Sequence, residues 1–142
     1  MKKMILSTLI LCLAGMVFTA KAQEVKSLTD EEFKKEIWNY TDNKDWKFLG
    51  DKPVIIDLYA TWCPPCKKLA PILEQVQKEY GEKIQIYKVD VDKEKSISQL
   101  FNVKSIPVMV FIPRDGKPFT VVGLRPQNQI EQIIQEKLDI KK

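Results

Sequence analysis

Two cysteines three positions apart are the residues in this chain whose types and spacing are best suited to chemistry. They stand in the segment Trp62-Cys63-Pro64-Pro65-Cys66. At the start of a helix, this spacing puts both thiols on one turn, where their sulfurs can close a small, reversible disulfide ring. Zinc knuckles, haem attachment sites and copper carriers share the same spacing. The pair therefore predicts either thiol–disulfide exchange or binding of a soft metal.

The other residue types of the chain narrow this choice. Lys67 stands where haem attachment requires histidine, and the sequence has no histidine at all. This disfavours histidine-based triads, histidine general bases and most zinc sites, because two thiolates alone do not complete a tetrahedral shell. A module that holds Cu(I) between the two thiolates stays open as an alternative from another class. For the redox interpretation we expect no metal and no cofactor.

The two cysteines should play different parts in an exchange reaction. Only a thiolate attacks a disulfide, and Cys63, at the helix cap, faces the positive end of the helix dipole, which lowers its pKa. We therefore predict that Cys63 is the nucleophile. Cys66 lies one turn inside the helix, so it should be more buried and should resolve the mixed disulfide.

The two prolines between the cysteines limit how strongly the Cys63 thiolate is stabilised. Pro64 and Pro65 have no N–H, so the amide of Cys66 is the main early backbone donor that remains. A moderately stabilised thiolate favours the disulfide form, and the pair should therefore act as a reductant.

The segments that flank the cysteines are a buried strand and a helix. Residues 54–59 are almost continuously apolar, as in a strand covered on both faces, and this run stops just before Cys63. Residues 64–80 have a helical period, with Pro71 expected to kink the helix and Gly81 expected to end it. The apolar positions of this helix are Leu69, Ile72, Leu73 and Val76.

The remaining segments continue the alternation of strands and helices. We expect a short strand within residues 24–28, and then a helix that begins after Thr29 and has Phe33, Ile37 and Tyr40 on one face. A strand at 84–91, a short helix at 94–101, an antiparallel hairpin of strands 108–112 and 119–122, and a final helix follow. The predicted class is α/β, with a mixed central sheet, a C-terminal antiparallel hairpin and helices on both faces. Such folds place their sites at the carboxyl ends of central strands.

The first 22 residues have the pattern of a signal peptide. Lys2 and Lys3 precede an apolar run, and Ala20-Lys21-Ala22 supplies a small-residue cleavage site. The run is shorter than the about 20 residues that a membrane span needs, so an uncleaved anchor is the weaker interpretation. Cleavage after Ala22 would lower the formal net charge from +4 to about +1. A chain with so small a charge gives no reason to expect binding to nucleic acid. Residues 23–142 would then form one mature domain in a compartment where disulfides persist.

Several separated motifs resemble those of the thioredoxin family. They are residues 57–67, which include the cysteine pair, then Ala70-Pro71, Ser105-Ile106-Pro107 and Val122-Gly123. The resemblance covers nearly all of residues 23–142 and implies a thioredoxin-like fold and a protein-disulfide reductase. The chain departs from the commonest pattern in having Pro-Pro between the cysteines. It departs again in an aromatic segment that contains Trp38, Tyr40, Trp46 and Phe48.

Asp57 is the residue expected to move protons at this site. Its place in an apolar strand should raise its pKa and let it exchange a proton with Cys66, a role that the resemblance also implies. Alternatively, Asp57 only accepts a backbone amide or pairs with Lys88. Lys88 matches the lysine that neighbours the acid in relatives, although a solvated lysine at the edge of a strand fits the sequence equally well.

Four further residues are assigned to substrate binding. The resemblance implies that Pro107 is a cis-proline that brings the backbone of Ile106 beside the disulfide, where an extended substrate segment can pair with it. An ordinary trans proline at the start of a strand is the alternative. Trp62 would cover the nucleophile, and Gly123 would give close access, unless they serve only packing and a bend.

Together these features predict an exported, periplasmic reductase of protein disulfides. Its partners would be exported proteins with disulfides and a membrane electron donor, and the chain would act as a monomer. A thiol oxidase, an isomerase or a thioredoxin-like protein of cytochrome c maturation is the alternative within the same fold.

Overall fold

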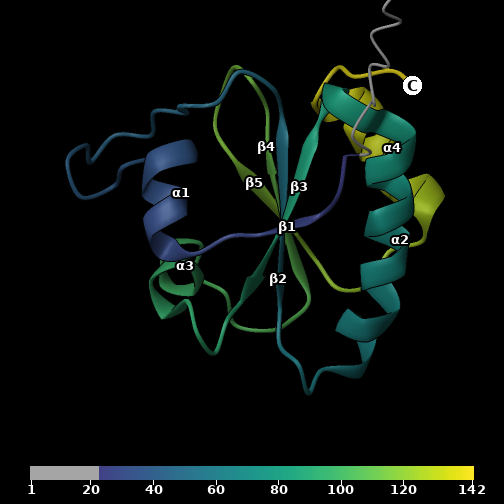
Figure 1. The fold of residues 1–142 in the computed structure, drawn as a ribbon, viewed down its shortest axis with the longest axis horizontal. Coiled ribbons are helices and arrows are strands. Elements are labelled where there is room, and N and C mark those ends of the chain that lie inside the picture. The colour runs from purple at the N-terminus through teal and green to yellow at the C-terminus, as the bar shows by residue number, and fades with distance from the viewer. Residues whose placement is uncertain (1–22) are drawn as a thin grey trace, which may run out of the picture.

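The computed structural model describes residues 23–142, which form a five-stranded sheet surrounded by four α-helices and one short 3-10 helix (Figure 1). The predicted signal peptide lies outside these residues. No helix within them is both long and apolar enough to cross a membrane. The elements are β1 (Lys26–Ser27), α1 (Asp30–Glu36), β2 (Val54–Tyr59), α2 (Pro64–Tyr80), η1 (Gly81–Lys83), β3 (Gln85–Asp90), α3 (Lys95–Leu100), β4 (Val108–Ile112), β5 (Phe119–Val122) and α4 (Gln127–Lys137).

The strands follow the order β1-β3-β2-β4-β5, so β2 lies at the centre of the sheet. β1, β3 and β2 run parallel to one another, whereas β4 pairs antiparallel with both β2 and β5. The predicted mixed sheet and the C-terminal antiparallel hairpin are therefore confirmed. The loop from β2 to α2 and the C-terminus of the chain lie at opposite ends of the sheet (Figure 1).

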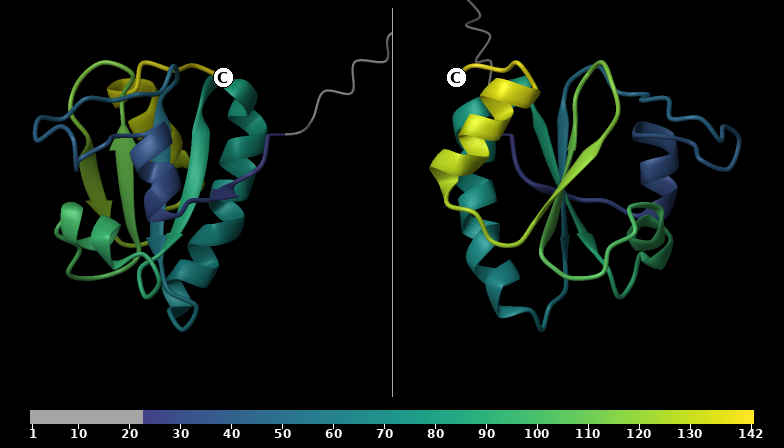
Figure 2. Two further views of the ribbon diagram at one scale, coloured as in Figure 1. Left: turned by 60° about the vertical axis from the view of Figure 1, so that its left-hand side comes forward. Right: turned by 180° about the vertical axis from the view of Figure 1, so that it is seen from behind.

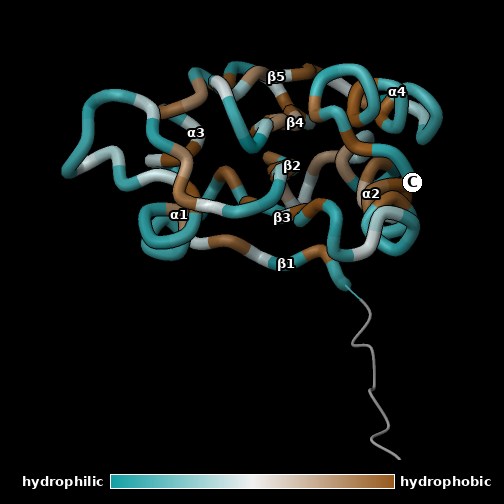
Figure 3. Tube along the Cα trace, turned by 90° about the horizontal axis from the view of Figure 1, so that it is seen from above, coloured by the Kyte–Doolittle hydropathy of each residue, from teal (hydrophilic) through white to brown (hydrophobic). Residues whose placement is uncertain are grey.

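Helices cover both faces of the sheet, with α1 and α3 on one face and α2 and α4 on the other (Figure 2). Successive side chains of β2 alternate between the two cores, as the period of a strand requires. Ile56 and Leu58 pack with Phe33 of α1, whereas Ile55 packs with Leu69 of α2. Figure 3 shows hydrophobic residues concentrated along the sheet and the helix sides that face it. Each face of β2 is thus buried, which explains why its sequence is almost continuously apolar.

The first helix is shorter than its apolar spacing predicted. Thr29 caps α1 in a capping box, as its sequence indicated, but α1 ends at Glu36, so the placement of Tyr40 on its helical face was wrong. The side chain of Asn39 accepts hydrogen bonds from the backbone amides two and three residues further on, both at 3.3 Å. Such local bonds compete with a helix. The ring of Tyr40 nevertheless packs on Phe33, with 6.2 Å between ring centroids.

The aromatic segment after α1 completes the cover of the same face. The rings of Trp38 and Trp46 meet edge to face with centroids 5.2 Å apart, and Trp46 stacks on Phe48. The indole N–H of Trp46 donates to the carbonyl of Gly116 in the β4–β5 loop at 2.9 Å. All three rings pack against the core beneath α1 and α3. The segment therefore makes up for the shortness of α1.

Candidate active site

The Cys63–Cys66 pair forms a disulfide at the junction between β2 and α2, with 5.3 Å between the two Cα atoms. Cys63 is the N-cap of α2, and its Sγ accepts a hydrogen bond from the backbone N–H of Cys66 at 3.3 Å. Pro64 and Pro65 occupy the first helical positions, where a missing N–H breaks no helical bond. The amide of Cys66 is thus placed to stabilise a Cys63 thiolate once the disulfide opens.

The prediction that Cys66 is more buried than Cys63 was wrong for the disulfide form, in which each residue is 3% exposed. Both cysteines belong to one buried cluster with Ala60, against which Ile106 packs. Their surroundings differ in another way. Cys66 lines a cavity together with Asp57, and Cys63 does not. The two cysteines therefore differ in their neighbouring residues and not in their burial.

Asp57 and Ile55 are two residues apart on β2, so their side chains point to the same face of the sheet. Ile55 packs on the α2 side, and the side chain of Asp57 therefore also faces α2, where Cys66 lies. The residue is 4% exposed, and its Oδ1 has no hydrogen-bond partner among the described residues. Burial of the carboxyl raises the pKa of Asp57 to about 7, and the positive charge of Lys88 opposes this rise. A carboxyl that titrates near neutral pH can both accept and return a proton.

Lys88 is the neighbour of Asp57 across the parallel β2–β3 pair, in register at the Cα atoms. Its side chain is exposed, and no ion pair joins it to Asp57 in the part of the chain that the structure describes. Lys88 therefore acts on the pKa of Asp57 through its charge without a direct contact. The catalytic parts assigned to both residues remain predictions.

The loop before β4 lies beside the disulfide. The Ile106–Pro107 peptide bond is cis, and Ile106 packs against the buried cluster of Ala60, Cys63 and Cys66. The amide of Gly123 donates to the carbonyl of Pro107 at 2.8 Å, with Gly123 at φ +90°, a conformation that glycine adopts without strain. Ile106 thus lies against the cluster that holds both cysteines, and a hydrogen bond joins Gly123 to Pro107; the part of all three in substrate binding remains a prediction.

Trp62 is 66% exposed, so its ring lies mostly in solvent beside the disulfide. The indole N–H donates to Oδ2 of Asp92 at 2.8 Å, which holds the ring in place. Sequence reasoning did not single out Asp92. Its only signal was its position, since it follows β3 at the same edge of the sheet at which β2 ends before Cys63.

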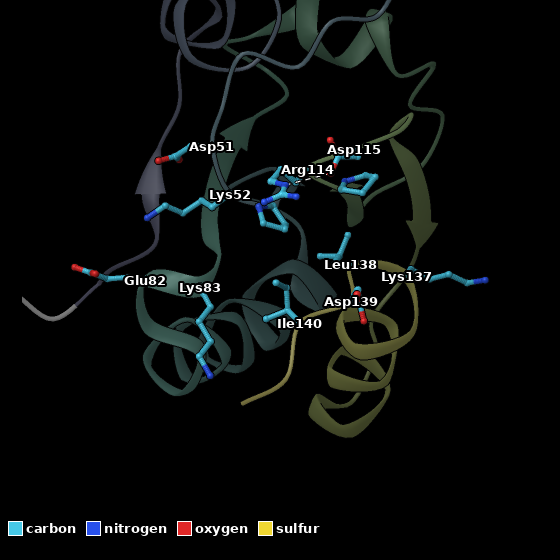
Figure 4. A pocket seen from close by; sticks show the side chains of 12 residues that line it. Asp51, Lys52, Glu82, Lys83, Arg114, Asp115, Lys137, Leu138, Asp139 and Ile140 are labelled. Carbon is cyan, nitrogen blue, oxygen red and sulfur yellow. Dashed lines mark hydrogen bonds and ion pairs between the residues drawn. The ribbon is translucent and has the colours of Figure 1, made fainter.

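A hollow larger than the cavity beside Cys66 lies at the other end of the sheet, and no cysteine lines it. It has a volume of about 770 Å³ and contains Pro53, which precedes β2, together with the tip of the β4–β5 hairpin and the end of α4 (Figure 4). Four cationic and four acidic side chains line it, so their charges balance. These are Lys52, Lys83, Arg114 and Lys137, with Asp51, Glu82, Asp115 and Asp139. Across residues 23–142, no three histidine, cysteine or acidic side chains group as metal ligands.

A disulfide that caps a helix at the carboxyl end of a central strand, next to a buried acid and a cis-proline, defines a thiol–disulfide oxidoreductase. Comparison with known proteins agrees with this class. The family model described as Thioredoxin matches residues 24–136. The chain is 48% identical to a thioredoxin of Borreliella burgdorferi over 110 residues, which are 78% of this chain and 94% of that protein.

Solved structures of thioredoxins have the same fold. A chloroplastic thioredoxin z superposes with a TM-score of 0.67 at 30% identity, covering 80% of this chain and 93% of that one. The thioredoxin of Malassezia sympodialis superposes with a TM-score of 0.64 at 34% identity, covering 80% and 90% of the two chains. The chain therefore belongs to the thioredoxin family, and its fold is thioredoxin-like, as the sequence predicted.

Proposed function

We propose that this protein is an exported reductase of protein disulfides that cycles between the Cys63–Cys66 dithiol and disulfide. The observation that carries the proposal is the disulfide at the cap of α2, with the carboxyl of Asp57 beside Cys66, its Oδ1 without a hydrogen-bond partner within residues 23–142. In the reduced enzyme, the Cys63 thiolate attacks one sulfur of a substrate disulfide. The other substrate sulfur leaves as a thiolate, and a mixed disulfide to Cys63 remains.

Resolution of that mixed disulfide falls to Cys66. Its thiol gives its proton to Asp57, and the resulting thiolate attacks Sγ of Cys63. The second substrate sulfur then leaves, and the Cys63–Cys66 disulfide forms again. The pKa of about 7 for Asp57 suits this transfer, because the carboxyl can be ionised before it and protonated after it near neutral pH.

The proposed direction of electron flow is towards the substrate. Of the first amides of α2, that of Cys66 donates to Cys63 Sγ, and the two prolines supply none. A thiolate with one such donor is stabilised only moderately, which favours the disulfide and makes the dithiol reducing. The reduction potential of the pair tests this. A value close to those of the strongest known thiol oxidants would contradict it and favour the oxidase or isomerase alternative.

The proposed location is the periplasm, with cleavage after Ala22. The basic, apolar and small-residue pattern of residues 1–22 supports it, and so does a family match that begins only at residue 24. In that compartment the protein would act as a monomer, receive electrons from a membrane donor and reduce exported proteins. N-terminal sequencing of protein recovered from the periplasm should begin at Gln23. Recovery of an intact Met1 terminus in the cytoplasm would contradict export without touching the redox chemistry.

Insulin reduction tests the activity itself. The wild-type protein should accelerate the precipitation of insulin by dithiothreitol, and Cys63→Ser should abolish this. Cys66→Ser should instead trap mixed disulfides with substrate. Cu(I) titration tests the alternative metal-binding module. Tight Cu(I) binding without any reductase activity would favour that module over the proposal.

A further inference from the structure

The loops at the disulfide end of the sheet carry three cationic and two acidic side chains. Four loops meet at this end, because β2 and β3 finish there, β4 begins there, and β5 finishes opposite the start of β4. These loops are residues 60–63, 91–94, 101–107 and 123–126. Their charged residues are Asp92, Lys93, Glu94, Lys104 and Arg125.

The two acidic side chains of these loops are engaged within the fold, whereas the three cations have no charged partner. Oδ2 of Asp92 accepts the indole N–H of Trp62 at 2.8 Å, and Oε2 of Glu94 accepts the backbone N–H of Asp30 at 3.0 Å. None of the three cations takes part in an ion pair within residues 23–142. Their charge is therefore available to a partner that approaches the disulfide.

Arg125 is the cation that lies beside the expected substrate site. A Cβ atom placed on Gly123 would lie 3.7 Å from Nη1 of Arg125, so the guanidinium lies next to the backbone of Gly123. The amide of Gly123 in turn donates to the carbonyl of Pro107, which follows Ile106. Nη1 of Arg125 donates to the carbonyl of Leu124 at 3.2 Å, and this is the one hydrogen bond that the side chain makes within the described residues. Most of the guanidinium donors are thus free to bind a ligand.

Exposed apolar side chains adjoin the same segment of the chain. Val122 and Leu124 flank Gly123, and both are exposed. Trp62, which precedes Cys63, is exposed as well, so three of the four exposed large hydrophobic side chains in residues 23–142 belong to this end of the sheet. Apolar side chains next to an arginine without an ionic partner are suited to an extended segment that has apolar residues and a carboxylate.

We propose that the guanidinium of Arg125 binds a carboxylate of the substrate segment that pairs with Ile106, so that the protein prefers disulfides flanked by acidic residues. The inference rests on the proposed reductase function and names a substrate class for the same site. Arginine presents paired N–H donors that match the two oxygens of a carboxylate. Lys93 and Lys104 add long-range attraction while such a partner approaches.

Single-turnover reduction of peptide disulfides by the pre-reduced protein tests the proposal. The two probes are disulfide-linked homodimers of one short peptide, which carries either Glu or Gln two residues to each side of its cysteine. The ratio of the Glu rate to the Gln rate should be about fivefold higher in the wild type than in Arg125→Gln, as for a strong exposed ion pair. Comparing ratios removes the effect of Glu on the reactivity of the peptide disulfide itself. Arg114→Gln removes the same charge at the opposite end of the sheet and should leave the wild-type ratio unchanged.

Arg125→Lys separates recognition of the carboxylate from a role in the structure of the loop. It keeps the positive charge, so its preference for the Glu peptide should stay above that of Arg125→Gln. Equal ratios in the wild type and Arg125→Gln would overturn the proposal, and so would an equal loss of preference in Arg114→Gln or in Arg125→Lys. If the pre-reduced wild type reduces neither peptide, the proposed reductase function fails. If it reduces both and Arg125→Gln does not change the ratio, this inference alone fails.

Discussion

The buried carboxyl of Asp57 should make the oxidised protein less stable as the pH rises, and Asp57→Asn should remove this dependence. In the folded chain its pKa is about 7, against an ordinary value of 3.8, chiefly because burial disfavours the charged form. Below about pH 4 the carboxyl is neutral in both the folded and unfolded states, so it carries no penalty. Between about pH 4 and pH 7 the unfolded chain releases this proton and the folded chain keeps it, and folding becomes steadily less favourable.

The size of this effect follows from the difference between the two pKa values. A gap of about three pH units corresponds to about 4 kcal/mol, because each unit is worth about 1.4 kcal/mol. Asparagine has nearly the same shape and stays neutral throughout. The free energy of unfolding of Asp57→Asn should therefore exceed that of the wild type by an amount that grows by about 4 kcal/mol between about pH 4 and pH 8.

Guanidinium unfolding of both oxidised proteins across this pH range measures the difference directly. Equal slopes of free energy against denaturant would show that the variant changes stability alone. A difference that stays constant with pH would refute the argument, since a group ionised in both states contributes no pH dependence. The same variant should slow turnover at neutral pH, because the Cys66 thiol loses its proton acceptor.

Three other substitutions test separate parts of the structure. Lys88→Gln removes the charge that lowers the pKa of Asp57, so the pH profile of turnover should shift upward; a profile that shifts downward would contradict this. Gln77→Leu deprives the buried amide of Ile86 of an acceptor at 2.6 Å and should cost about 1–3 kcal/mol of unfolding free energy, which denaturant titration would measure. Trp62→Ala removes an exposed ring beside the disulfide and should raise KM for insulin more than it lowers kcat, whereas an unchanged KM would exclude it from substrate contact.

Most of the fold was predictable because its strands and helices have clear periodicities. The continuous apolar run of β2 indicated burial on both faces, and Gly81 marked the end of α2. The end of α1 was not predictable from spacing. It depends on the side chain of Asn39, and on a backbone bond from Leu49 to the carbonyl of Ile37, which returns the chain against the helix end at 2.9 Å. A contact between such distant positions leaves no periodic signal.

At the site, residue types and helix spacing predicted the cysteine pair and the amide that caps it. The equal burial of the two cysteines was not predictable, because it depends on tertiary packing: Ile106, from another part of the chain, packs against the cluster that contains both cysteines. The same holds for the bond from Trp62 to Asp92, which joins positions 30 residues apart. The sequence therefore predicted the reactive residues of the site but not the contacts that distant segments make with them.

The difference between the two sulfurs comes from the parity of a single strand. Asp57 faces α2 because it shares the side of β2 with Ile55, while its neighbour Leu58 faces the core beneath α1 and α3. A slip of one residue along β2 would turn the carboxyl to the other face, away from Cys66. The cap of α2 places its amide on Cys63, and the strand places its acid beside Cys66. One sulfur is thereby prepared to be a stable thiolate and the other to exchange a proton, although both are equally hidden from solvent.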